Sequence, residues 1–73
     1  MQLEKKICRR FGKRVKLLRL RGRLSQEDFA DQAGIDSSYL GKVERGERNP
    51  SLGVIARIAK AFGITLAELL SDV

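Results

Sequence analysis

The stretch from Gln26 to Glu44 reads QEDFADQAGIDSSYLGKVE and predicts two short helices joined by a turn at Gly34. Ala30 stands where two crossing helices need a minimal side chain so that their axes can approach closely. Gly34 stands where the turn is expected to take a positive φ, which glycine adopts at the least cost. The remaining inward positions carry small or apolar residues, namely Phe29, Ala33, Ile35, Leu40 and Val43. This pattern predicts a helix-turn-helix motif.

Both helices of the motif have an N-terminal capping signal. Ser25 and Asp28 have the three-residue spacing of a capping box at the start of the first helix. Asp36 is the expected cap of the second helix, because an aspartate side chain accepts hydrogen bonds from the first free backbone N–H groups.

The charge of the chain favours nucleic acid as the partner of this motif. Fifteen Lys and Arg against nine Asp and Glu give a formal charge of +6 and a pI near 10.1. Ten of the basic residues lie in positions 1–23, where Glu4 is the single acid. General attraction to DNA is therefore expected from the N-terminal segment and sequence reading from the less charged middle. A plain helical hairpin inside an all-α domain is the alternative.

Size and composition exclude several other classes of protein. Seventy-three residues predict a single domain, residues 1–73, with little room for an enclosed active site. Histidine is absent and Cys8 is the one cysteine, so no metal site, no cofactor, no small-molecule ligand and no enzymatic activity are expected. Cys8 is interpreted as a small core residue, with a redox-sensing thiol as the alternative. The N-terminal residues MQLEKKICRRFGKR contain no apolar run of membrane-span or signal-peptide length. A cytoplasmic, nucleoid-associated protein is expected.

The segment before the motif predicts a helix over about residues 3–20. Its apolar residues recur at spacings of three and four, and its basic residues form a stripe on another side of the same helix. A basic amphipathic helix can also lie on a membrane, but this apolar face is expected to cover the following helices. The apolar positions are Cys8, Phe11, Val15 and Leu18, and the basic positions are Lys6, Arg9, Lys13 and Lys16.

The segment after the motif predicts two more helices, which makes five in an all-α fold. Gly46 ends the motif's second helix, and Pro50 places a loop before the fourth helix, which Ser51 or Asn49 caps. Leu52, Ile55, Ala59 and Phe62 are its expected inner face. Gly63 ends it, and Thr65 with Glu68 forms a capping box that opens a short fifth helix. This short helix with its leucines, Leu66, Leu69 and Leu70, is expected to form a dimer contact together with Val54 or Ile58 of the fourth helix, and packing in the core alone is the alternative.

Two segments together resemble the lambda-repressor-like helix-turn-helix family, the Cro/cI or XRE type. They read LSQEDFADQAGIDSSYLGKVERGERNPSL and IAKAFGITLAELL, and the resemblance runs from about Arg14 to Leu70. It implies a compact five-helix DNA-binding domain that regulates transcription as a homodimer on a partly palindromic operator. Phage-type regulators, restriction-modification controller proteins and stand-alone repressors are all compatible with it, and it fixes neither the operator nor the sign of regulation.

The resemblance also assigns roles to individual residues of the motif. The recognition helix spans about residues 36–45, and Ser37, Ser38 and Lys42 match positions that reach base edges in the major groove. Gly41 lies on the same side of the helix by periodicity, but a larger residue often stands there in the family. A glycine at this position either allows close approach to the groove or is merely tolerated.

Other positions are expected to hold the DNA backbone or the fold. Gln26 opens the first helix of the motif, where free N–H groups and the helix dipole favour a phosphate. Arg19 and Glu44 match a family pair that forms a structural salt bridge. The expected phosphate contacts are Gln26, Tyr39, Arg45, Arg48 and Asn49.

Two rival functions belong to different classes. A protein-interaction module of the same fold, of the antitoxin or coactivator-bridging type, is the first, although no partner-wrapping segment is visible after Val73. A nucleic-acid enzyme is the second, and no carboxylate cluster with metal-site spacing supports it.

Overall fold

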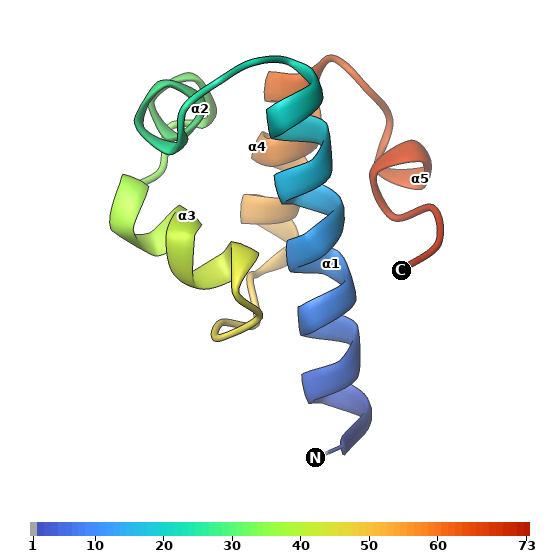
Figure 1. Cartoon of the computed structure of the whole chain (residues 1–73). Helices are drawn as coiled ribbons and strands as arrows, with labels where there is room; N and C mark the ends of the chain where they lie inside the picture. The colour runs from blue at the N-terminus through green and yellow to red at the C-terminus, as the bar shows by residue number, and fades with distance from the viewer. Residues whose placement is uncertain (1) are drawn as a thin grey trace.

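The computed structural model describes residues 2–73, and within them the chain forms five helices and no strand. Helix α1 (Gln2–Arg21) is the longest, and its N-terminal end projects beyond the rest of the molecule (Figure 1). Helices α2 (Gln26–Ala33) and α3 (Ser37–Glu44) lie on one side of α1. Helix α4 (Leu52–Phe62) packs against α2, and the short α5 (Leu66–Leu69) follows it. The predicted all-α, five-helix class is confirmed.

The ends of the helices are set by the local signals in the sequence. Ser25 accepts a hydrogen bond from the Asp28 backbone N–H at 3.0 Å and so caps α2. Gly34 takes the left-handed conformation, with φ +70°, and the next N–H group bonds back to the Ala30 carbonyl. Ser51 caps α4, and Thr65 with Glu68 forms the complete capping box that opens α5.

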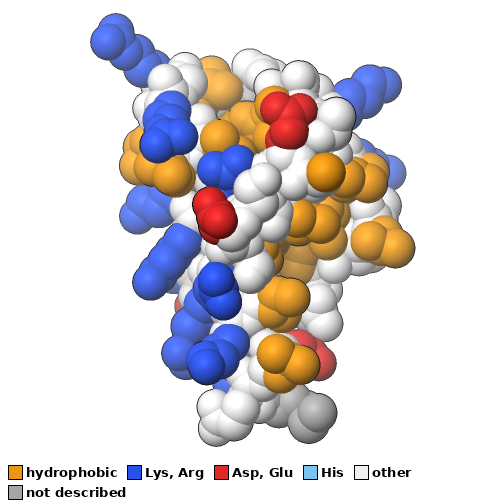
Figure 2. All heavy atoms as spheres, turned by 90° about the vertical axis from the view of Figure 1, so that its right-hand side faces the viewer, with side chains coloured by type: hydrophobic (Ala, Val, Ile, Leu, Met, Phe, Trp, Pro, Cys, Tyr) orange, Lys and Arg blue, Asp and Glu red, His pale blue; other side chains and the backbone are white. Residues whose placement is uncertain are grey.

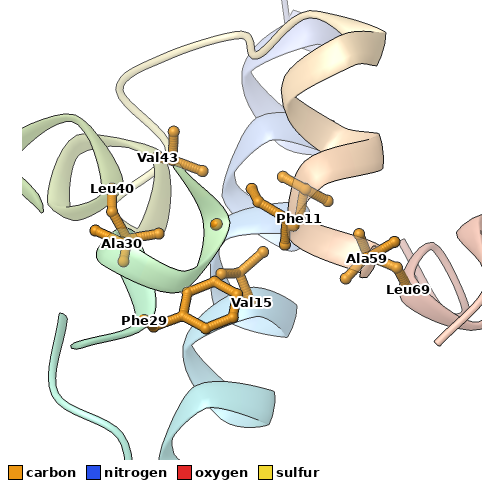
Figure 3. Packing of buried hydrophobic residues seen from close by; sticks show 10 residues of the cluster. Phe11, Val15, Phe29, Ala30, Leu40, Val43, Ala59 and Leu69 are labelled. Atoms are coloured by element: carbon orange, nitrogen blue, oxygen red, sulfur yellow. The ribbon is translucent and has the colours of Figure 1, made fainter. Parts of the chain in front are cut away.

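The core lies where α1, α2, α3 and α4 meet, and α5 closes it from the far side through Leu69 (Figure 3). Val15 and Phe29 are fully buried, and Phe29 stacks on Phe62 with ring centroids 4.2 Å apart. Ala30 is buried at the α2–α3 crossing, as its small size predicts. Cys8 is buried at the edge of this core.

The inner face of α4 differs from the sequence pattern at two positions. The pattern places Leu52 on the inward side, but it is 76% exposed because it begins the helix outside the edge of the core. Ile58, a candidate dimer contact by sequence, is completely buried. The inward stripe runs through Ile58 and Ala59, with Ile55 and Phe62 packed against it at helical spacing.

Candidate nucleic-acid interface

Helix α3 begins at an aspartate whose ionised form is stabilised by the helix itself. Asp36 accepts hydrogen bonds from the backbone N–H groups of Ser38 at 3.1 Å and Tyr39 at 3.3 Å, and also from the Ser38 hydroxyl. The side-chain hydrogen bond from Ser38, then the bond from the Tyr39 backbone, hold the pKa of Asp36 below its ordinary value. The cap fixes the backbone geometry of the first turn of α3.

One side of α3 is buried and another is open. Leu40 and Val43 are fully buried against α1 and α2, which places the candidate base-reading residues Ser38 and Lys42 on the other side. Ser38 is exposed, and Ser37 and Lys42 are half-buried. The open side carries a cation and two hydroxyl groups, which are groups that can donate to base edges.

Gly41 differs from its expected place on the open side of α3, because it is buried. A Cβ atom built at this position would lie 3.4 Å from the Arg45 guanidinium and 3.5 Å from the Gln26 side-chain oxygen. These two side chains therefore cover the glycine.

A buried ion pair ties α1 to the end of α3. Arg19 donates to both carboxylate oxygens of Glu44, at 2.7 and 3.0 Å, and its third nitrogen donates to the Leu24 carbonyl at 2.8 Å. The side chains of Arg19 and Glu44 are only 8% and 2% exposed. This is the structural pair that the resemblance implies. With the Leu24 carbonyl, it gives each of the three guanidinium nitrogens of Arg19 a hydrogen-bond acceptor.

Gln26 joins the same network from the start of α2. Its amide nitrogen donates to Glu44 at 3.0 Å. Each side-chain amide carries two N–H donors, so a second donor is left at the beginning of α2, beside the free backbone N–H groups of the first turn. The contact orients the Gln26 side chain in the absence of DNA.

The loop between α3 and α4 carries the other expected phosphate-binding residues, and all three are exposed. Arg45 forms a two-point contact with Glu47, with distances of 2.9 and 3.3 Å. The hydrogen bond from Arg45 lowers the pKa of Glu47. Arg48 donates to the Glu47 backbone carbonyl at 3.0 Å, and Asn49 follows it. Glu47 is absent from the residues that the sequence predicts for this site, although its place two residues after Arg45 is a signal for the contact.

Tyr39 is half-buried and packs against the core. It stands on α3 between Ser38 and Leu40, and so at the border of the buried and open sides. This is the position expected for a residue that shares its ring with the core and its hydroxyl with solvent.

Two glycines bring the backbone of α1 against α3 and its loop. A Cβ built at Gly12 would collide with the Val43 carbonyl oxygen and lie 2.5 Å from that of Glu44. Gly46 has φ +76°, and a Cβ there would lie 2.9 Å from the Arg9 Cα. Gly12 is not among the residues that the sequence pattern predicts to matter, and its one signal is that it is an isolated glycine inside an amphipathic helix.

The basic residues of α1 are divided among different neighbours. Arg14 donates to the backbone carbonyls of Glu68 at 2.7 Å and Leu69 at 3.2 Å, and so holds the C-terminal end of α5. Arg10 donates to the Asp72 carbonyl at 3.3 Å. Together with Arg19, these residues serve the fold.

Neither a metal-binding cluster nor a membrane-spanning helix is found among the described residues. Among residues 2–73, no three or more His, Cys, Asp or Glu side chains gather in a way that could hold a metal ion. None of the helices in residues 2–73 combines the length and the apolar character needed to span a bilayer.

Comparison with known proteins identifies the motif. A helix-turn-helix family model matches residues 15–69. The control protein C.MunI of Mycoplasma sp. is 46% identical over 65 residues, which cover 88% of each chain. The immunity repressor of Bacillus phage phi105 is 34% identical and covers 84% of this chain, which spans only 42% of the repressor.

A solved structure supports the same assignment. The crystal structure of the restriction-modification controller protein C.AhdI from Aeromonas hydrophila superposes with a TM-score of 0.82 and 47% identity. The match covers 85% of this chain and 94% of C.AhdI. The chain belongs to the XRE-type helix-turn-helix family of DNA-binding transcriptional regulators.

Proposed function

We propose that the protein binds a specific, partly palindromic sequence in double-stranded DNA as a homodimer, with α3 in the major groove, and thereby controls transcription. We further propose that it is a controller of a restriction-modification system. The similarity to C.MunI and C.AhdI supports this subtype, because both relatives are matched over nearly their whole length. Such a regulator acts in the bacterial cytoplasm, where the DNA is.

The observation that carries the proposal is that the open side of α3 lies beside two segments whose residues we propose to bind phosphates. Its open side presents Ser38 and Lys42. The start of α2 is held to the end of α3 by the Gln26–Glu44 contact, the α3–α4 loop follows directly, and Gln26 and Arg45 both lie beside Gly41 of α3. Helix N-termini and exposed arginines contact phosphates, and the helix beside them contacts base edges.

The residue roles follow from this arrangement. Lys42 donates to guanine O6 and N7, and the two serines bind base edges as donors or acceptors. Gly41 contributes to reading only after Gln26 and Arg45 turn toward phosphates and uncover it. The base-edge residues are Ser37, Ser38, Gly41 and Lys42, and the phosphate-binding residues are Gln26, Tyr39, Arg45, Arg48 and Asn49.

Homodimerisation is supported by apolar side chains that the fold leaves uncovered. Leu66 of α5, Leu70 just after it and Leu52 of α4 are exposed, and Val54 is half-buried. Figure 2 shows apolar side chains running along one side of the molecule and basic side chains along the other. Two copies joined through α4 and α5 would bind half-sites about 34 Å apart, one turn of DNA. Sedimentation that finds a monomer both free and on DNA would reject this part of the proposal.

The decisive experiment separates base reading from phosphate binding. The operator is first selected from a random DNA pool with the wild-type protein. Lys42→Ala should then weaken operator binding by about 1–3 kcal/mol and affect scrambled DNA much less. Arg45→Ala should weaken binding to both duplexes and reduce the slope of log K against log salt by about 0.9.

Glu47→Gln is the matched control for the loop. It releases Arg45 from its carboxylate partner and removes a negative charge beside the DNA, so it should tighten binding to both duplexes. Equal weakening of both duplexes by Lys42→Ala, with relaxed sequence preference in Arg45→Ala, would reverse the two roles. If the selection enriches no sequence at all, the interaction-module alternative is favoured.

A further inference from the structure

An open, charged hollow lies between the N-terminal half of α1 and the α3–α4 loop. Its volume is about 430 Å³, and Lys5, Arg9, Arg45, Arg48 and Asn49 contribute to its lining. Four cationic side chains line it against two acidic ones, Glu4 and Glu47, and Glu47 is already paired with Arg45.

We propose that Lys5 and Arg9 of α1, together with Arg48 and Asn49 of the loop, bind a backbone phosphate of the DNA beyond the segment that α3 reads. The inference rests on the proposed function, because the ligand is the same duplex. It gives the N-terminal half of α1 a direct role in the length of DNA that the protein covers.

The backbone of α1 is fixed against the loop at this point. A Cβ at Gly46 would lie 2.9 Å from the Arg9 Cα and 3.1 Å from the Arg9 backbone nitrogen. The stem of Arg9 therefore lies across Gly46, beside the loop that is proposed to contact DNA. Lys5 stands one helical turn before Arg9 on the same face of α1.

Lys5 and Arg9 are the basic residues of α1 that line the hollow, and within residues 2–73 neither donates a side-chain hydrogen bond to a protein group. Arg10, Arg14 and Arg19 of the same helix donate hydrogen bonds to protein groups. Within residues 2–73 the ion pairs are Arg19–Glu44 and Arg45–Glu47, so neither Lys5 nor Arg9 takes part in one. Both residues are exposed and free to meet a ligand.

Lys5 and Arg9 lie before the motif, in the part of α1 that extends away from it. The family match begins at residue 15, so Lys5 and Arg9 lie outside the shared motif. The helix that carries them nevertheless continues without a break to Gln2 and projects past the α3–α4 loop (Figure 1). A cationic extension at the exit of α3 is placed to follow the phosphate backbone outward from the half-site.

The experiment uses two duplexes with the selected operator, one cut at the edge of the half-sites and one extended by flanking DNA of arbitrary sequence. Wild type should bind the extended duplex more tightly. The Lys5→Ala/Arg9→Ala double variant should bind both duplexes with equal affinity. On the extended duplex its slope of log K against log salt should fall by about 0.9 for each phosphate that is no longer bound.

The matched control is Arg57→Ala/Lys60→Ala, which removes the same charge from exposed positions on α4 that border a separate hollow with Gln32 and Ala33. It should keep the preference for the extended duplex. Lys5→Gln changes a single exposed residue of α1 and keeps the test valid if the double variant melts early by circular dichroism.

The inference is overturned if the Lys5 and Arg9 variants retain the wild-type preference for the extended duplex, or if the control abolishes that preference equally. A sequence preference that survives in all these variants leaves the proposed function intact in either case. Failure of the wild type to select any DNA sequence would instead reject the proposed function itself.

Discussion

Replacing Glu44 by alanine tests whether the buried Arg19–Glu44 ion pair stabilises the packing of α1 against α3. The change removes the carboxylate that accepts two hydrogen bonds from Arg19 and one from Gln26. Arg19 then remains buried with only the Leu24 carbonyl as a partner. Removing one member of a buried pair costs about 3–5 kcal/mol, because the other charge stays uncompensated away from water.

This cost is large for a chain of 73 residues. At roughly 0.05–0.15 kcal/mol per residue, the total free energy of unfolding is about 4–11 kcal/mol. Glu44→Ala therefore removes about a quarter of it or more, and the melting temperature should fall by at least about 12 °C. Thermal and urea unfolding followed by circular dichroism at neutral pH measures this destabilisation.

Two further variants show whether the uncompensated charge is the cause. Glu47→Ala breaks the exposed Arg45–Glu47 pair and should change the melting temperature little. Arg19→Met/Glu44→Leu replaces the buried pair by apolar side chains and should recover most of the stability that Glu44→Ala removes. A melting temperature for Glu44→Ala close to that of wild type, or a double variant no more stable than the single one, would refute the reasoning.

Three other outcomes are expected. Gly12→Ala should destabilise the protein by at least about 1–3 kcal/mol in urea unfolding, because the added Cβ meets the α3 backbone. This loss is expected although alanine favours helix more than glycine does. Unchanged stability would contradict the close crossing of α1 and α3. Gly41→Ala should raise the unfolding free energy by up to about 1 kcal/mol while weakening operator binding in titrations, and unaltered binding would show that the glycine is merely tolerated. The folded-state pKa of Asp36 is lowered, so its stabilisation is complete above the ordinary pKa of about 3.9 and disappears as the pH falls through the folded value. In Asp36→Asn, the unfolding free energy measured with urea should no longer show this decrease at acid pH. A pH profile of stability identical to that of wild type would contradict the role of the cap.

The helix boundaries were predictable because they depend on neighbours in sequence. Caps and C-terminal glycines act over three to five residues, so Ser25, Asp36 and Gly34 could be assigned from spacing alone. The core face of α1 was predictable for the same reason, since its apolar residues follow the helical period.

Features that depend on which helices meet were not predictable from local patterns. The pattern placed Leu52 on the inner face of α4 and Ile58 among the candidate dimer contacts, but the position of the core leaves the first exposed and the second buried. The hydrogen bonds of Arg14 to α5 join residues 54 and 55 positions apart. Gly12 is notable only once α3 is known to cross at that point.

The candidate site shows the same division. Periodicity and the resemblance placed Ser38 and Lys42 away from the core but also placed Gly41 there, which is buried, and the resemblance paired Arg19 with Glu44. It did not indicate that Gln26 completes this network or that Glu47 holds Arg45. The Gln26 contact joins the start of α2 to the end of α3, whereas the Glu47 contact lies within one loop, and neither follows from helical periodicity.

The close backbone contact at Gly12 also determines when the surface of α3 becomes ordered. A helix of eight residues has little helicity by itself in water, so α3 depends on its contacts with α1 for its shape. The conformational entropy of fixing these residues is therefore given up during folding, before any DNA is present. In the proposed complex, association orders only side chains such as Lys42 and Arg45, and a preorganised backbone leaves more of the contact energy available as affinity.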